Sequence, residues 1–169
     1  MFGKRFLLVA ALLLAGCTAE KPAAAPPSPA PSATVASAAA ATGCGAAPET
    51  GPLPTWARAG FSGDGGGVPH VLGRHGDILG VLFGRKLSAP PAPDVSNKIL
   101  WVSRLPLIPS DPLKITAKLD GTTETADRTI LGGPGPSIVD LPKPGCWHLR
   151  LAWSGHTETI DLTYQPLTR

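Results

Sequence analysis

The sequence predicts an all-β protein, with one immunoglobulin-like β-sandwich of about seven short strands over residues 44–169. Three observations favour this class. The chain of 169 residues contains 20 glycines and 20 prolines, which disfavour long helices. Short apolar segments recur between turn signals, and several alternate between apolar and polar residues with the period of a strand. No helical periodicity extends beyond two turns after residue 44, and a single antiparallel sheet or small barrel is the alternative architecture.

An irregular arm, residues 44–68, opens the predicted domain. The arm is rich in glycine and proline, and we expect its isolated aromatic residues Trp56 and Phe61 to hold it against the core. The first strand follows at residues 78–83, where an uninterrupted apolar run is typical of a strand buried on both faces. The proline-rich residues 90–93 then form a loop before the next strand.

Turn signals separate the strands that follow. Residues 98–104 are apolar around Trp101, and residues 113–119 alternate strictly between apolar and polar side chains. Asp120 and Gly121 then indicate a tight hairpin turn. By the same criteria, the remaining strands are residues 122–131, 137–141, 146–153 and 157–164.

The last two predicted strands carry the clearest alternation. In residues 146–153 every second residue is apolar, which places Cys146, His148 and Arg150 together on the outward face. A turn at Ser154 and Gly155 connects this strand to the final one. The inward residues of the pair are therefore expected to be Trp147, Leu149, Leu151, Trp153, Ile160, Leu162 and Tyr164.

The amino-terminal residues have the pattern of a bacterial lipoprotein signal. A short basic segment precedes the apolar run FLLVAALLLA, residues 6–15, which is too short to span a hydrocarbon core that needs about 20 residues. The run continues into Leu14-Ala15-Gly16-Cys17, which resembles the bacterial lipobox. The resemblance implies that diacylglycerol alkylates Cys17 and that cleavage after Gly16 removes residues 1–16. An ordinary secretory signal with a chance cysteine is the alternative.

Residues 17–43 are expected to be a disordered tether. They consist almost entirely of alanine, proline, serine and threonine, so they cannot bury enough apolar surface to fold. Two acyl chains on Cys17 would anchor the protein stably without any other membrane contact. We therefore expect a protein held at the extracytoplasmic face of the cell membrane through the lipid on Cys17.

The other two cysteines are predicted to form a disulfide. With Cys17 assigned to the lipid, Cys44 and Cys146 remain as an even pair in a compartment where disulfides persist. Their bond would join the start of the domain to the penultimate strand. Two free thiols, or two thiols that share a metal with histidine, are the alternatives.

One part of the domain resembles a known group. The segment Pro144-Gly145-Cys146-Trp147, the alternating strand that ends at Trp153 and the closing strand to Tyr164 resemble the C-terminal hairpin of uncharacterised bacterial cell-envelope lipoproteins. The run Asn97-Lys98-Ile99-Leu100-Trp101 is similar to that group as well. The resemblance extends over about residues 54–166 and implies a β architecture and an envelope location, without an activity.

No pattern for catalysis, metal binding or a cofactor stands out. The chain contains neither a Gly-x-Ser-x-Gly elbow nor a Ser-x-x-Lys motif. Its histidines at positions 70, 75, 148 and 156 lack a recognised metal-ligand spacing, so we expect them to be exposed or locally hydrogen-bonded. Two tryptophans are expected in the core and would be contact residues if exposed. The possible surface contacts are therefore Trp56, Trp101, His148 and His156.

The charge balance and the anchor together limit the function. The formal net charge is +3, but removal of Lys4 and Arg5 with the signal peptide leaves basic and acidic residues nearly equal in number. A nearly neutral chain has no electrostatic footprint for nucleic acid. We expect a non-catalytic binding or structural module of the envelope, with another envelope protein or wall polymer as its partner. A metal-handling or redox-linked lipoprotein that uses histidine and cysteine, or an accessory to a cell-wall hydrolase, are the alternatives.

Overall fold

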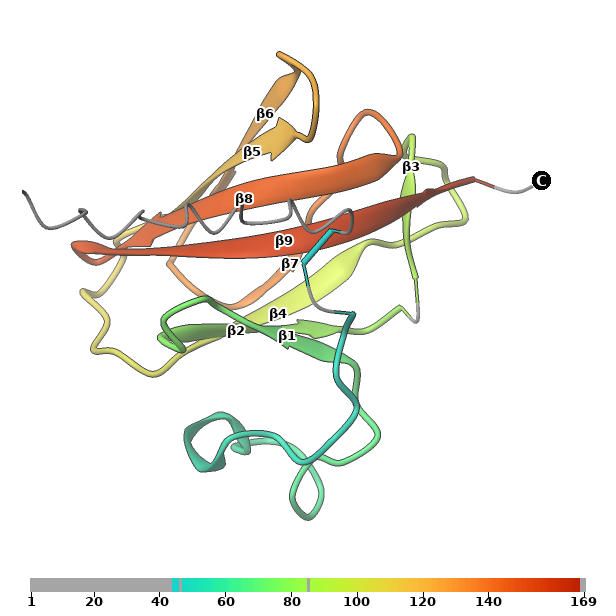
Figure 1. The fold of residues 1–169 in the computed structure, drawn as a ribbon. Helices are drawn as coiled ribbons and strands as arrows, with labels where there is room; N and C mark the ends of the chain where they lie inside the picture. Colours follow the sequence, from blue (N-terminus) through green and yellow to red (C-terminus); the bar gives the residue numbers. More distant parts are fainter. Residues whose placement is uncertain (1–43, 46, 85, 168–169) are drawn as a thin grey trace, which may run out of the picture. The chain divides into compact units, whose positions relative to one another are not determined.

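Two facing β-sheets form the framework of the part of the chain that the structure describes (Figure 1). The computed structural model describes residues 44–45, 47–84 and 86–167, so the predicted signal peptide, the tether and Cys17 lie outside the described residues. Within these ranges the chain forms nine strands and one 3-10 turn, Thr55–Ala57, and no helix there is long and apolar enough to cross a membrane. The predicted all-β sandwich is therefore confirmed.

The first sheet has four strands in the order β1-β2-β4-β7, and all neighbours are antiparallel. The register places Gly80 of β2 opposite Trp101 of β4. A Cβ atom at position 80 would lie 3.0 Å from the Trp101 ring, so the glycine makes room for the indole. The bounds of the strands are His70–Leu72 for β1, Ile78–Leu82 for β2, Lys98–Ser103 for β4 and Pro136–Ile138 for β7.

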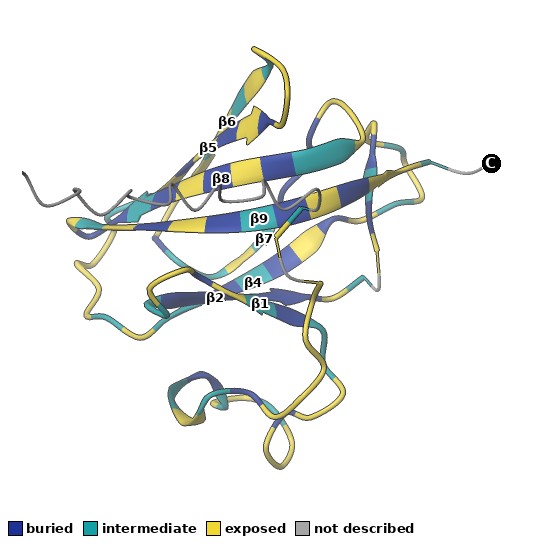
Figure 2. Cartoon of the chain, in the orientation of Figure 1, coloured by how far each residue is buried: buried dark blue, intermediate teal, exposed yellow. Residues whose placement is uncertain are grey.

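The second sheet has five strands in the order β3-β9-β8-β5-β6. The short strand β3 is parallel to β9, whereas the other neighbours are antiparallel. Burial alternates along β5, β8 and β9 as the sequence predicts, with the apolar side chains toward the first sheet (Figure 2). The bounds are Leu87–Ala89 for β3, Leu113–Leu119 for β5, Thr125–Ile130 for β6, Gly145–Trp153 for β8 and His156–Pro166 for β9.

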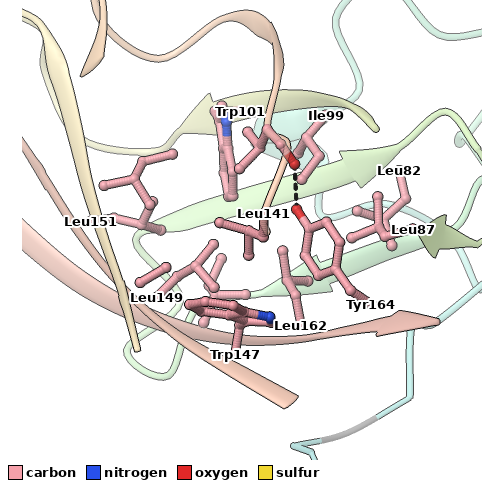
Figure 3. Close-up of a cluster of buried hydrophobic side chains, with 14 of the residues drawn as sticks. Leu82, Leu87, Ile99, Trp101, Leu141, Trp147, Leu149, Leu151, Leu162 and Tyr164 are labelled. Carbon is pink, nitrogen blue, oxygen red and sulfur yellow. Dashed lines mark hydrogen bonds between the residues drawn. The ribbon is translucent and has the colours of Figure 1, made fainter. Parts of the chain in front are cut away.

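The main core lies between the sheets and contains three tryptophans and a tyrosine whose polar atoms all find partners. Figure 3 shows two of the tryptophans, Trp101 and Trp147, together with Tyr164. The Tyr164 hydroxyl donates to the Val139 carbonyl oxygen at 2.6 Å. Burial, together with the nearby Asp140 charge, raises the pKa of Tyr164, so its hydroxyl stays protonated as a donor. The Trp101 indole N–H donates to Ser137 Oγ, and the Trp153 indole N–H donates to Ser103 Oγ. The Trp147 indole N–H donates to the Lys143 carbonyl oxygen.

The arm forms a third layer on the outer face of the first sheet. Leu53 and Ala57 are buried there against the outward residues of β2, and Trp56 and Phe61 are partly buried beside them. This second cluster is separate from the main core, so the two aromatic residues hold the arm to the outer face of the sheet. The cover that the arm provides also explains why β2 is buried on both faces, as its apolar run predicts.

The structure differs from the sequence prediction in the number and length of strands. Nine strands occur within the described residues where about seven were expected, because β1 and β3 have three residues each and carry too little alternation to be recognised. Strand β7 ends at Ile138, whereas the predicted strand continued to Leu141. The finer assignment to the immunoglobulin-like class stays a prediction.

Candidate functional site

The predicted disulfide is present and lies on the outer face of the second sheet. Cys44 and Cys146 are bonded, with their Cα atoms 5.0 Å apart and a sequence separation of 102. Because the neighbouring Trp147 points into the core, Cys146 points outward, as predicted. The disulfide therefore joins the start of the domain to the first residues of β8, and we call this end of the sandwich the disulfide end.

Near the disulfide, His148 lies between two carboxylates. Its Nδ1 atom is 2.8 Å from Asp161 Oδ1 on β9, and its Nε2 atom is 3.2 Å from Asp120 Oδ1 beyond the end of β5. Hydrogen bonds to Asp161 first, and then to Asp120, raise the pKa of His148. Each ring nitrogen of His148 therefore faces a different carboxylate. Among the described residues, no group of histidine, cysteine and carboxylate side chains is suited to hold a metal ion. This arrangement is an exposed ionic link between three segments of one sheet.

Four loops meet at the opposite end of the sandwich, which we call the loop end (Figure 1). Strand register places the β4–β5 and β8–β9 loops there, because Lys114 pairs with Ala152 whereas Leu119 pairs with Trp147 near the disulfide. The other two are the β1–β2 and β6–β7 loops. The loops of the loop end are residues 73–77, 104–112, 131–135 and 154–155.

Hydrogen bonds hold three of these loops to one another, namely residues 73–77, 104–112 and 154–155. The Arg104 N–H donates to the Asp77 carbonyl oxygen at 2.9 Å, and the Arg104 guanidinium also pairs with the Asp77 carboxylate. The Ile108 N–H donates to Ser154 Oγ at 2.9 Å, and the Ser154 N–H donates to Asp111 Oδ2 at 2.5 Å. Ser154 has a φ of 47°, a backbone conformation that costs energy for a residue other than glycine and persists only where its surroundings impose it.

A buried carboxylate at the loop end was missed by the sequence reasoning. Glu158 is 1% exposed, and its oxygens accept from the N–H groups of His75 and Thr159 at 2.8 Å each and lie 3.0 Å from His75 Nδ1. It therefore links β9 of one sheet to the β1–β2 loop of the other. The available signal was its alternation with Ile160 and Leu162, which places it on the inward face.

Exposed apolar side chains are concentrated at the loop end. Six large apolar side chains are exposed among the described residues, and four of these lie in the loops of the loop end or next to them. Leu131 is the most exposed of them, at 86%. Loops that are tied down by hydrogen bonds yet expose apolar side chains are typical of recognition surfaces. The four residues are Leu72, Leu107, Ile108 and Leu131.

The residues considered as surface contacts have different surroundings. Trp101 is only 2% exposed and belongs to the core, so it offers no contact surface. Trp56 is partly covered within the arm. His148 is exposed in its ionic link, whereas His156 is partly buried beside Trp153, with ring centroids 5.7 Å apart. His70, which was not among these candidates, is buried and hydrogen-bonded locally to the Val68 carbonyl oxygen, within the expectation for the histidines.

The surface beside the disulfide is hollowed only slightly. The hollow that Lys86, Leu87 and Asp161 line has a volume of about 120 Å³, below the roughly 300 Å³ typical of pockets for drug-sized ligands. A hollow beside the arm is larger, at about 630 Å³, but no charged side chain lines it; its lining residues are Pro48, Thr50, Gly67, Pro69 and Phe83. In comparisons with known proteins, no family model, no curated protein and no solved structure matches the chain. Because no comparison suggests a function, the exposed loops are the feature from which a function can be inferred. Gly16 and Cys17, which form the predicted cleavage site, lie outside the described residues.

Proposed function

We propose that this protein is a lipid-anchored, extracytoplasmic binding module of the bacterial cell envelope, and that it recognises another envelope protein through the loop end. The observation that carries the proposal is the exposure of Leu107 and Ile108 on a loop that hydrogen bonds hold in place. Burial of such side chains against a partner supplies binding free energy, and little conformational entropy is lost because the loop is already ordered.

The position of the disulfide supports this use of the loop end. The tether predicted from the sequence would join the domain at Cys44, and Cys44 is bonded to Cys146 at the far end of β8 from the exposed loops. A chain that arrives at the disulfide end leaves the loop end open to a partner. The lipobox pattern at Cys17 supports the anchor, and the disulfide is consistent with an oxidising compartment.

We also propose that the sandwich belongs to the immunoglobulin-like class. The order β2-β4-β7 in one sheet and β9-β8-β5 in the other corresponds to strands A, B and E facing strands G, F and C of that class. In immunoglobulin variable domains the loops between B and C and between F and G bind the ligand. The corresponding loops here, β4–β5 and β8–β9, both belong to the loop end. This correspondence supports the proposed surface by analogy of fold alone.

Photo-crosslinking in cells tests the proposed surface. A photoreactive residue in place of Ile108 should give an adduct with one defined envelope protein. Ile138 is the matched control, because its exposure of 61% is close to the 58% of Ile108 and it lies outside the loop end. The purified partner should then bind the parent protein, and Ile108→Ser should weaken this binding by about tenfold or more. Identical adducts from both positions, or unchanged affinity of the serine variant, would show that recognition occurs elsewhere.

A further inference from the structure

We propose that the Cys44–Cys146 disulfide is the point at which tension in the tether enters the fold, and that a partner at the loop end then loads the β5–β8 strand pair in shear. The biological source of the tension, an anchor at one end and a partner at the other, rests on the proposed function. The path of the force through the domain depends only on the disulfide and on the strand topology.

The disulfide diverts tension away from the arm. A pull on Cys44 passes through the two sulfur atoms to Cys146 and β8, so residues 45–69 carry none of it. These residues are held by an apolar cluster and by a few backbone hydrogen bonds, such as the pair between Glu49 and His70 at 2.8 and 2.9 Å. Without the disulfide, the same pull would act on the arm first and peel it from the outer face of the first sheet.

Beyond the disulfide, the force enters a central strand. Strand β8 is paired on both sides, through nine residues with β9 and through six with β5. Its inward side chains, among them Trp147 and Trp153, are buried in the main core. A pull on Cys146 is therefore opposed by two ladders of backbone hydrogen bonds and by side chains buried in the main core.

The direction of loading follows from where β5 and β8 begin. Strand β8 begins at the disulfide end, whereas its antiparallel neighbour β5 begins at the loop end, directly after the β4–β5 loop. Opposite pulls on Cys146 and on Ile108 therefore slide these two strands along each other. The hydrogen bonds between antiparallel strands are perpendicular to the strands, so sliding loads them together, whereas peeling breaks them one at a time.

This geometry also specifies the kind of partner. A domain that resists shear is useful only if its partner is held independently of the lipid anchor. Movement of the partner relative to the membrane then stretches the tether. An extended tether of residues 17–43 would span about 80 Å at the rise of polyproline II. We therefore infer that the partner is an envelope protein that is fixed in place within this reach of the membrane.

Single-molecule pulling on the mature chain, residues 17–169, tests the force path without lipid or partner. One handle is attached at residue 17 and the other at an azide-bearing residue in place of Ile108. We expect no lengthening of the domain before one main rupture. Reduction of the disulfide should add an early step at low force, with about 80–90 Å of released chain from residues 45–69. Chemical reduction of the folded protein avoids reliance on a cysteine variant that fails to fold.

A second pulling geometry provides the control. With the second handle at Arg169 instead of position 108, the pull acts on Cys146 and on the end of β9, which lie at the same end because Cys146 pairs with Thr163. This geometry peels the strands apart, so the rupture force should be several-fold lower. Equal rupture forces in the two geometries, or an early step with the disulfide intact, would overturn the proposal. The crosslinking result at Ile108 would be unaffected by either outcome, so the two proposals fail separately.

Discussion

Glu158 and His75 are 83 residues apart in the sequence, yet the Glu158 carboxylate accepts the His75 backbone N–H at 2.8 Å and lies 3.0 Å from its Nδ1 atom. The contact joins β9 of the second sheet to the β1–β2 loop of the first. It holds the β1–β2 loop of the loop end against the first residues of β9. One buried carboxylate therefore positions one of the four loops of the proposed recognition surface.

Glu158→Ala should lower the free energy of unfolding by about 2–4 kcal/mol, because the N–H groups of His75 and Thr159 would lose their acceptor and a buried side chain would be truncated. Denaturant unfolding of the purified domain measures this change. Glu124→Ala is the matched control. Glu124 pairs with Lys143 on the surface, and its removal should cost less than about 1 kcal/mol. Similar losses in the two variants would contradict the structural role of Glu158.

Gly73→Ala should also destabilise the loop end. A Cβ atom at position 73 would lie 2.4 Å from Glu158 Cγ, so Glu158 or the β1–β2 loop would have to move. We expect a loss of about 1–3 kcal/mol in the free energy of unfolding, typical of overpacking. Gly51→Ala is the control, since a Cβ atom there meets no other atom within 4 Å. Equal stability of the two alanine variants would argue against this packing.

Reduction of the disulfide should destabilise the domain strongly. The bond spans 102 residues, and closure of a loop of this length is worth up to about 4.7 kcal/mol in the chain-entropy model, with about 2–4 kcal/mol typical in practice. Unfolding curves with and without reductant measure the loss. Non-reducing mass spectrometry of the native protein provides the control for the bond itself. Two free thiols, or a loss below about 1 kcal/mol, would contradict this prediction.

The ionic link at His148 should make stability depend on pH. Its pKa in the folded protein is raised above the ordinary value of 6.5, chiefly by hydrogen bonds to Asp161 and Asp120. A raised folded pKa means that the stabilisation is fully present below the unfolded pKa and is lost as the pH rises through the folded pKa. The difference in unfolding free energy between the parent and His148→Gln should therefore shrink above pH 6.5.

NMR titration of the His148 ring gives the direct measurement for this link. Replacement of both Asp120 and Asp161 by asparagine should return the pKa of His148 toward its ordinary value and remove the pH-dependent difference. The link is exposed, so we expect salt to weaken it. A pKa at or below 6.5 in the parent protein would contradict the hydrogen-bonded arrangement.

Elements with a long repeating pattern could be predicted from the sequence. Strands β5, β8 and β9 have 7, 9 and 11 residues, and each alternates over enough positions to define its buried face. The disulfide could be predicted as well, because the assignment of Cys17 to the lipid leaves only Cys44 and Cys146. In these cases the information is local or combinatorial, so no knowledge of the tertiary structure was needed.

Elements that depend on contacts between distant residues could not be predicted. Strand β3 has three residues and is recognisable only by its parallel pairing with the end of β9. The alternation of β9 places Glu158 on the inward face, but the residues near position 158 do not reveal the N–H groups of the β1–β2 loop that its carboxylate accepts from. The loop end likewise forms only when four separate loops meet, which is why its exposed residues Leu107 and Ile108 were not singled out from the sequence.

Mass spectrometry of the mature amino terminus tests the proposed anchor most directly. We expect the protein purified from bacterial membranes to begin at Cys17 and to carry a diacylglyceryl group on that residue. Cys17→Ser should lose the lipid and leave the membrane fraction, while the folded domain keeps its disulfide. An unlipidated amino terminus at another residue, or a serine variant retained in membranes as fully as the parent, would contradict the proposed function.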